Sequence, residues 1–204
     1  MKPKFGLEKE VFLLNTSNEP CIVPKKFPHD DEGFQVEFRG HPHEDITEAV
    51  YSMLANEDYH VKQIKSEGYK ILQVPLLKIP RDLKLKARRN FTKGVLKFQN
   101  LYSFKRHAVA QHESTAGIHL SITFPQPIYH KGKLVSSFNG MWDWVQFFKY
   151  LDEHFKEEIK ESKRKPGFYE LKPDGRIEYR SLPNTISMEK LISVVSNYDF
   201  FRDV

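Results

Sequence analysis

The sequence predicts an α+β protein in which helices pack against one face of an antiparallel sheet. Segments with the alternating pattern of strands are spread along the whole chain, and three other segments carry apolar residues at helical spacing. Their order lacks the regular strand–helix alternation of a parallel, doubly wound sheet. With 204 residues the chain is long enough for one sizeable core and short for two, so we expect one domain over residues 1–204.

The N-terminal part is expected to hold two strands and a helix. Residues 4–14 alternate apolar and polar side chains, imperfectly around the acids, and residues 33–40 form a second strand bounded by glycines. Prolines and a glycine make residues 18–33 a turn-rich connection. Asp45 can cap the helix that follows, and Glu48 stands three residues later, as in a capping box. An apolar helical face comes next.

The middle of the chain contains the clearest strand. Residues 69–79 are apolar and β-rich, although Pro75 requires an edge or a bend there. Residues 80–107 give weak signals and are expected to form a long, basic, partly mobile insertion. Residues 117–124 alternate strictly. Ile118, Leu120, Ile122 and Phe124 face one side of this strand, and Gly117, His119, Ser121 and Thr123 face the other.

The C-terminal part predicts a long helix, a hairpin and a last helix. The apolar stripe of residues 140–162 indicates one helix, which a proline–glycine pair ends. Residues 168–182 are expected to form a hairpin around a Pro-Asp-Gly turn at 173–175. Residues 187–198 carry the last amphipathic pattern.

Composition excludes several classes of protein. No apolar run approaches the roughly 20 residues that cross a bilayer, the N-terminus is a poor signal peptide, and the single Cys21 excludes an intrachain disulfide. We therefore expect a cytoplasmic protein that does not bind membranes. Residues 78–106 hold ten Lys or Arg and one acid, Asp82, which suits the phosphates of a nucleotide or nucleic acid or, equally well, a solvated basic face.

Charged residues recur at same-face spacing in the predicted strands. Glu8 and Glu10 are two residues apart, so they emerge together and repel each other unless a cation or water separates them. Glu37 and Arg39 repeat this spacing. Each pair alone is typical of a solvated strand face or a surface ion pair.

Two later strands add a histidine and another acid–arginine pair. His119 shares its face only with small residues, which leave room for a ligand, although a lone strand histidine is more often structural. Glu178 and Arg180 again share a face, where the carboxylate can hold a metal and the guanidinium can clamp a phosphate. Four carboxylates, one histidine and two arginines on four strands are costly to bury without a cation, so together they indicate a metal–phosphate site.

The segments that carry these residues resemble, in this order, the carboxylate–amine ligases of the glutamine-synthetase-like fold, and among them most closely the phage-type amidoligases. The resemblance covers about a third of the chain and implies a single catalytic domain whose curved antiparallel sheet surrounds divalent cations, with helices on its outer face. The matching segments are FGLEKEVFLL, DEGFQVEFRGHP, STAGIHLSITF and GFYELKPDGRIEYRSLPN.

The resemblance also implies roles for single residues. Glu8, His119 and Glu178 would hold the metal that bridges the phosphates of ATP. Glu10 and Glu37 would hold a second metal near the acyl substrate, with Mg²⁺ or Mn²⁺ as the ions. Arg180 would stabilise the transferring phosphoryl group, so the expected catalytic residues are Arg180, Glu37 and Glu178. Nucleotide contacts are expected from Arg180, Lys172 and Arg164, and contacts to the acyl substrate from Arg39, His41 and His43.

The implied activity is ATP-dependent joining of a carboxylate to an amine through an acyl phosphate. The substrates would be small molecules or peptide ends, and the chain is short enough that a homo-oligomer could complete the site. The sequence leaves two alternatives open. One is a metal-dependent phosphohydrolase or nuclease, and the other is a non-catalytic protein that binds nucleic acid through residues 78–106.

Overall fold

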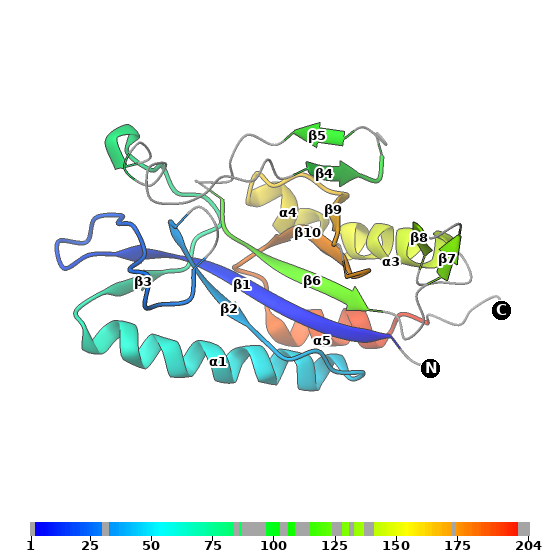
Figure 1. Cartoon of the computed structure of the whole chain (residues 1–204), viewed down its shortest axis with the longest axis horizontal. Helices are drawn as coiled ribbons and strands as arrows, with labels where there is room; N and C mark the ends of the chain where they lie inside the picture. Colours follow the sequence, from blue (N-terminus) through cyan, green and yellow to red (C-terminus); the bar gives the residue numbers. More distant parts are fainter. Residues whose placement is uncertain are drawn as a thin grey trace.

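An eight-stranded antiparallel sheet is the centre of the structure, a computed structural model (Figure 1). The strands follow the order β2-β1-β6-β10-β9-β4-β5, and β3 also pairs with β1. Strands β7 (Ile128–His130) and β8 (Lys133–Ser136) form a separate hairpin. The structure describes residues 3–29, 33–83, 86, 97–102, 106–108, 115–123, 128–130, 133–136, 141–172 and 174–199. The main strands are β1 (Lys4–Leu14), β2 (Gln35–Arg39), β3 (Lys70–Leu72), β4 (Lys97–Asn100), β5 (Arg106–Ala108), β6 (Gly117–Thr123), β9 (Phe168–Leu171) and β10 (Ile177–Pro183).

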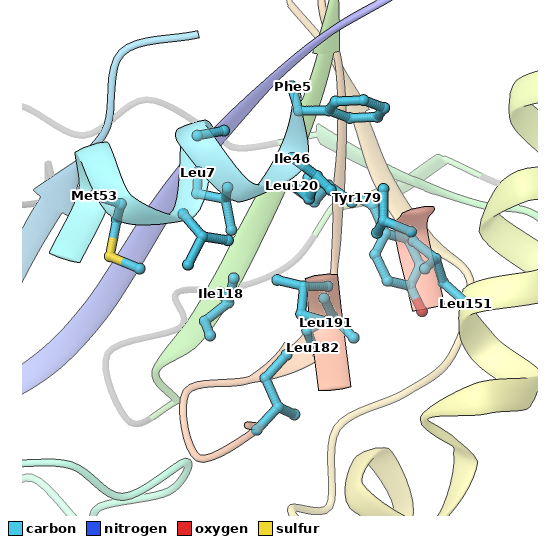
Figure 2. Packing of buried hydrophobic residues seen from close by; sticks show 14 of the residues in the cluster. Phe5, Leu7, Ile46, Met53, Ile118, Leu120, Leu151, Tyr179, Leu182 and Leu191 are labelled. Atoms are coloured by element: carbon cyan, nitrogen blue, oxygen red, sulfur yellow. The ribbon is translucent and has the colours of Figure 1, made fainter. Parts of the chain in front are cut away.

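Helices cover one face of this sheet, as predicted. They are α1 (Ile46–Ser66), α3 (Met141–His154), α4 (Lys156–Glu161) and α5 (Met188–Ser196). The main core cluster joins apolar residues of all four helices to those of the central strands. Figure 2 shows Ile46 and Met53 of α1 in one apolar cluster with residues of β6 and β10, such as Leu120 and Tyr179. The predicted class, α+β with an antiparallel sheet and helices, is confirmed.

Alternation along the strands separates an apolar face from a polar face. In β6, Ile118, Leu120 and Ile122 belong to the core cluster, and the residues between them point away from it, as the sequence predicted. In β1, Leu7 packs in the core, and Lys9 on the same side forms an ion pair with Glu57 of α1, with Nζ and Oε1 2.7 Å apart. The acids of β1 therefore emerge on the opposite face, which α1, α3, α4 and α5 leave uncovered and on which Phe12 packs in a second, smaller apolar cluster.

The predicted cap and turn residues have the expected roles. The Asp45 side chain accepts a hydrogen bond from the Thr47 backbone N–H at 2.7 Å and begins α1. Gly175, with φ +87°, makes the turn between β9 and β10 and adopts a conformation that favours glycine. The proline predicted for this turn lies outside the described residues.

Three predicted elements differ in the structure. The helix expected over 140–162 is interrupted at Phe155, whose backbone (φ −112°, ψ 16°) redirects the chain so that α4 packs against β10. The strand expected over 69–79 ends at Leu72, ahead of Pro75, which has no N–H to donate. The insertion expected over 80–107 contributes β4 and the start of β5 to the sheet edge, while much of its basic stretch (78–106) lies outside the described residues.

The length and hydropathy of a helix decide whether it could span a membrane. In the part of the chain that the structure describes, none of the helices combines the length and the apolar character that a membrane span requires.

Candidate metal and phosphate site

Strands β1, β6 and β10 bring three predicted metal ligands together on the uncovered face. In the register of β1 and β6, Glu8 is the partner of His119. In the register of β10 and β6, Glu178 is the partner of Ser121, which is two residues from His119. Residues two apart on a strand share a face, so the three side chains emerge together. We call Glu8, His119 and Glu178 the metal trio.

The side chains of the metal trio converge closely. His119 Nδ1 lies 3.6 Å from Glu8 Oε2 and 3.5 Å from Glu178 Oε1. One potential ligand atom from each residue lies within 4.8 Å of the other two. Glu178 is 0% exposed and His119 is 2% exposed, while Glu8 is partly buried. Two carboxylates and an imidazole therefore meet largely out of contact with water.

The metal trio fits a divalent cation by its donors and its spacing. His119 Nδ1 is buried and, within the described chain, has no hydrogen-bond partner. A buried ring nitrogen without a partner is unfavourable unless a bound ligand interacts with it. Carboxylate oxygens are preferred by Mg²⁺ and Mn²⁺, and imidazole is a common metal ligand. Ligands about 2.1 Å from an octahedral cation lie about 3.0 Å apart when adjacent and about 4.2 Å apart when opposite. The 3.5 and 3.6 Å separations fall between these values.

Glu10 and Glu37 are register partners across β1 and β2, yet their carboxylates contact different groups. Glu10 accepts a hydrogen bond from the Gly117 backbone N–H at 2.9 Å, and its Oε1 lies 3.5 Å from His119 Nε2. Glu37 accepts a hydrogen bond from Arg39 Nε at 2.6 Å. Over the described ranges, only the metal trio brings three potential ligands together, so a second cation held by Glu10 and Glu37 stays a prediction.

Burial and neighbouring charges separate the pKa values of these carboxyl groups. Burial and the charge of Glu8 raise the pKa of Glu37 to about 8, against the opposing effect of Arg39. Burial also disfavours ionisation of Glu8, but the close His119 ring, with smaller contributions from Glu37 and Arg39, holds the Glu8 pKa far below its ordinary value. For Glu178, burial is again outweighed by His119 and Arg180, and the pKa is lowered. Two acids of the metal trio are therefore ionised at neutral pH.

Two cationic side chains flank the metal trio on the β9 side. Arg180 donates hydrogen bonds to Glu178 and to Glu170 Oε2, the latter at 3.2 Å. Lys172 Nζ lies 2.8 Å from Glu170 Oε2 and 3.3 Å from Glu178 Oε2. A guanidinium and an ammonium group beside a metal site are the groups that proteins use to bind phosphate oxygens.

Arg164 supplies a third cation at the start of β6. A Cβ atom built on Gly117 would lie 2.7 Å from the central carbon and both terminal nitrogens of the Arg164 guanidinium, so the guanidinium occupies the space that any other residue would fill. Nη2 donates to the Arg180 carbonyl at 2.6 Å, and Nη1 is buried with no hydrogen-bond partner in the described residues. Burial lowers the Arg164 pKa to about 10, against the charge of Glu10. The group is still a cation at neutral pH.

The three residues expected at the acyl substrate are not equally close to the metal trio. Arg39 borders it, since Nε lies 3.5 Å from Glu8 Oε1, and its side chain is 64% exposed. His43 exchanges backbone hydrogen bonds with Phe5, and the His41 backbone N–H donates to Ser52 of α1 at 2.8 Å. Neither imidazole belongs to the group of potential metal ligands found in the described part of the chain, so the predicted roles of His41 and His43 stay predictions.

Sequence reasoning missed two residues that support the site. Glu170 binds both Lys172 and Arg180, and the Glu-x-Lys spacing at 170 and 172 is the only sequence signal for it. Asn184 donates from its amide to the backbone carbonyls of Glu10 at 2.9 Å and Val74 at 3.1 Å. Its fully buried side chain ties the end of β10 to β1, a contact between residues 174 positions apart that no local pattern indicates.

The segments that carry the ligase resemblance form consecutive strands of the sheet, in the order β2, β1, β6 and β10. Their acids and the histidine lie on one face, next to Lys172 and Arg180. Comparison of the chain with models of known protein families gave no match, and no curated protein matched significantly.

Proposed function

We propose that this protein is an ATP-dependent carboxylate–amine ligase that requires Mg²⁺ or Mn²⁺ and has a glutamine-synthetase-like fold. The observation that supports the proposal is the convergence of the metal trio within 4.8 Å beside Arg180 and Lys172. Phosphoryl transfer needs positioning and charge stabilisation above all, and a metal site flanked by guanidinium and ammonium groups supplies both. The ligase class itself comes from the resemblance of the four strand segments.

The metal trio would hold the divalent cation, which supplies charge neutralisation to the phosphates of the nucleotide. Arg180 and Lys172 would bind oxygens of the transferring phosphoryl group, where charge develops. Arg164, with a buried N–H that lacks a partner in the described chain, can donate to a further oxygen of the nucleotide or of the acyl group. Arg39, at the exposed edge next to Glu8 and Glu37, would bind the acid substrate.

The proposed reaction has two steps. An oxygen of the substrate carboxylate attacks the γ-phosphorus of ATP, the bond to the β-phosphate oxygen breaks, and ADP leaves. The amine nitrogen then forms a bond to the acyl carbon, the bond from that carbon to the phosphate oxygen breaks, and inorganic phosphate leaves. Glu37 is the candidate acceptor for the proton that the amine loses, because its pKa of about 8 suits general base catalysis near neutral pH.

Hydroxylamine provides a test that does not require the natural amine. The protein is incubated with ATP, Mn²⁺ and a panel of carboxylic acids, and both ADP and acyl hydroxamate are measured. We expect ADP and hydroxamate in equal amounts with at least one acid, and loss of both in Glu178→Gln. Asp58→Asn, on the exposed side of α1, is the matched control and should keep full activity.

Other outcomes separate the alternatives. ADP release that does not depend on any acid would indicate a phosphohydrolase. Metal-dependent cleavage of nucleic acid without ATP would indicate a nuclease, and salt-sensitive nucleic-acid binding that survives Glu178→Gln would indicate a binding protein. Absence of ADP and hydroxamate across a broad panel, with folded protein that binds Mn²⁺, would contradict the ligase proposal.

A further inference from the structure

Both carboxylate oxygens of Glu178 are engaged by positive or donor groups. Oε1 accepts a hydrogen bond from Arg180 and lies 3.5 Å from His119 Nδ1. Oε2 lies 3.3 Å from Lys172 Nζ and accepts a hydrogen bond from the Ser121 hydroxyl at 3.4 Å. A divalent cation that binds Glu178 therefore competes with Lys172 and Arg180 for the same oxygens.

The charges around the metal trio are nearly balanced in the ligand-free arrangement. Apart from the Glu37–Arg39 pair at the exposed edge, four carboxylates face three cationic side chains, a formal sum of −1. A divalent cation alone changes this sum to +1 and lies next to two like charges. A cation that arrives with a dianionic phosphate leaves the sum at −1, because the phosphate offsets the charge of the cation. The carboxylates are Glu8, Glu10, Glu170 and Glu178, and the cations are Arg164, Lys172 and Arg180.

Glu170 gives the two competing cations a second partner. It lies 2.8 Å from Lys172 Nζ and 3.2 Å from Arg180 Nη1, through the same Oε2 atom. The Lys172 and Arg180 side chains are only 20% and 13% exposed, so an unpaired charge there would be costly. Because both also contact Glu170, each can leave Glu178 and still have an acidic partner. The exchange needs small side-chain movements on β9 and β10 rather than movement of the sheet.

We propose that Lys172, with Arg180, couples cation binding to phosphate binding at this site. Lys172 neutralises Glu178 while the site is free, moves away when the divalent cation binds the metal trio, and then binds an oxygen of the phosphate ligand. Cation and phosphate thus raise each other's affinity by the same factor, as linkage requires. This inference rests on the proposed function in that it takes the same site to bind a divalent cation and the phosphates of a nucleotide.

Calorimetric titration with Mn²⁺ tests the coupling, with sulfate as a tetrahedral dianion that binds Mn²⁺ weakly in solution. In the wild type we expect sulfate to tighten Mn²⁺ binding by about 5–50-fold, and Mn²⁺ to tighten sulfate binding equally. Lys172→Met should bind Mn²⁺ alone about 3–30-fold more tightly, because a like charge is removed next to the cation. In the same variant, sulfate should tighten Mn²⁺ binding less than about threefold.

Lys190→Met is the matched control, since Lys190 pairs with Glu158 between α5 and α4, and it should behave as the wild type. Lys172→Gln, which keeps a polar contact to Glu170, replaces Lys172→Met if the latter does not fold. The inference is overturned if sulfate leaves the Mn²⁺ affinity of the wild type unchanged, or if neither Lys172 variant binds Mn²⁺ more tightly than the wild type. Hydroxamate formation without coupling would refute this inference alone, and coupling without ADP or hydroxamate would refute the ligase proposal alone.

Discussion

At the scale of single residues, His119 and its neighbours determine what the uncovered face of the sheet can bind. The flanking same-face residues, Gly117 and Ser121, are small, so the imidazole stands between carboxylates, and the Arg164 guanidinium fills the space over Gly117. Its buried Nδ1 lacks a hydrogen-bond partner in the described residues and lies within 3.6 Å of two carboxylates. A divalent cation would satisfy all three groups.

Glu178→Gln should weaken Mn²⁺ binding at least about 100-fold, more than the loss of an outer-sphere contact usually does. Glutamine keeps the volume, and its single amide oxygen can accept the hydrogen bond from Arg180 while its NH2 donates to the Ser121 hydroxyl oxygen, but it removes the charge that the cation needs. Titration followed by electron paramagnetic resonance of free Mn²⁺ measures the affinity. Asp58→Asn should bind like the wild type, and a Glu178→Gln protein with unchanged affinity would show that the metal trio is not the site.

Glu37→Gln should change how stability depends on pH in metal-free protein. The Glu37 pKa is raised from 4.5 to about 8, so the stability linked to its protonated form is complete below pH 4.5 and is lost as pH rises through 8. Glutamine stays neutral, and the variant should gain about 2–4 kcal/mol relative to the wild type between pH 4.5 and pH 9. Urea unfolding in chelator at several pH values measures this. If the difference in free energy of unfolding between wild type and variant stays constant with pH, the prediction is wrong.

At the scale of elements, the close approach of β2 to α1 fixes the strand that carries Glu37 and Arg39. Gly40 follows β2, and its backbone N–H donates to the Leu7 carbonyl at 2.9 Å. A Cβ at Gly40 would lie 2.8 Å from the Met53 backbone nitrogen. Backbone of a packed helix cannot yield as a flexible side chain can, so this contact requires glycine.

Gly40→Ala should therefore destabilise the protein by about 1–3 kcal/mol, because α1 must shift away from the sheet. Gly6→Ala is the matched comparison: its Cβ would meet only the Ser121 Cβ, at 3.7 Å, an ordinary contact. Urea unfolding of both variants measures the difference. Equal stabilities would show that α1 does not constrain β2 at this point.

At the scale of the whole molecule, the sheet separates two kinds of interaction. One face buries apolar side chains under the helices (Figure 2), and the other gathers charged groups from β2, β1, β6, β10 and β9 beside a smaller apolar cluster around Phe12. The apolar face stabilises the fold through burial, whereas carboxylates brought together on the polar face oppose it unless cations compensate. Ligand binding at the polar face is therefore expected to stabilise the entire sheet.

Mn²⁺ should raise the thermal unfolding midpoint, and excess chelator should reverse the change. At a free concentration about 100 times Kd, binding to the folded state alone adds about 2.7 kcal/mol of stability. Differential scanning calorimetry measures the shift, and Glu178→Gln should show little of it at the same concentration. An equal shift in both proteins would mean that Mn²⁺ stabilises the chain somewhere other than the metal trio.

The sequence by itself determined which residues form the central strands, and which of their side chains share a face. The alternation in β6 separated His119 from the core residues, and the same-face spacing grouped Glu8 with Glu10 and Glu178 with Arg180, because the two-residue period of a strand is a local property.

Only the tertiary structure decided how the strands pair and which charges meet. In the folded chain Glu10 contacts the Gly117 backbone N–H rather than its register partner Glu37, the predicted long helix is interrupted at Phe155, and Lys172 lies against Glu178. These outcomes depend on register and on packing between segments far apart in the chain, where small differences in side-chain direction select the partner, and no local period encodes them.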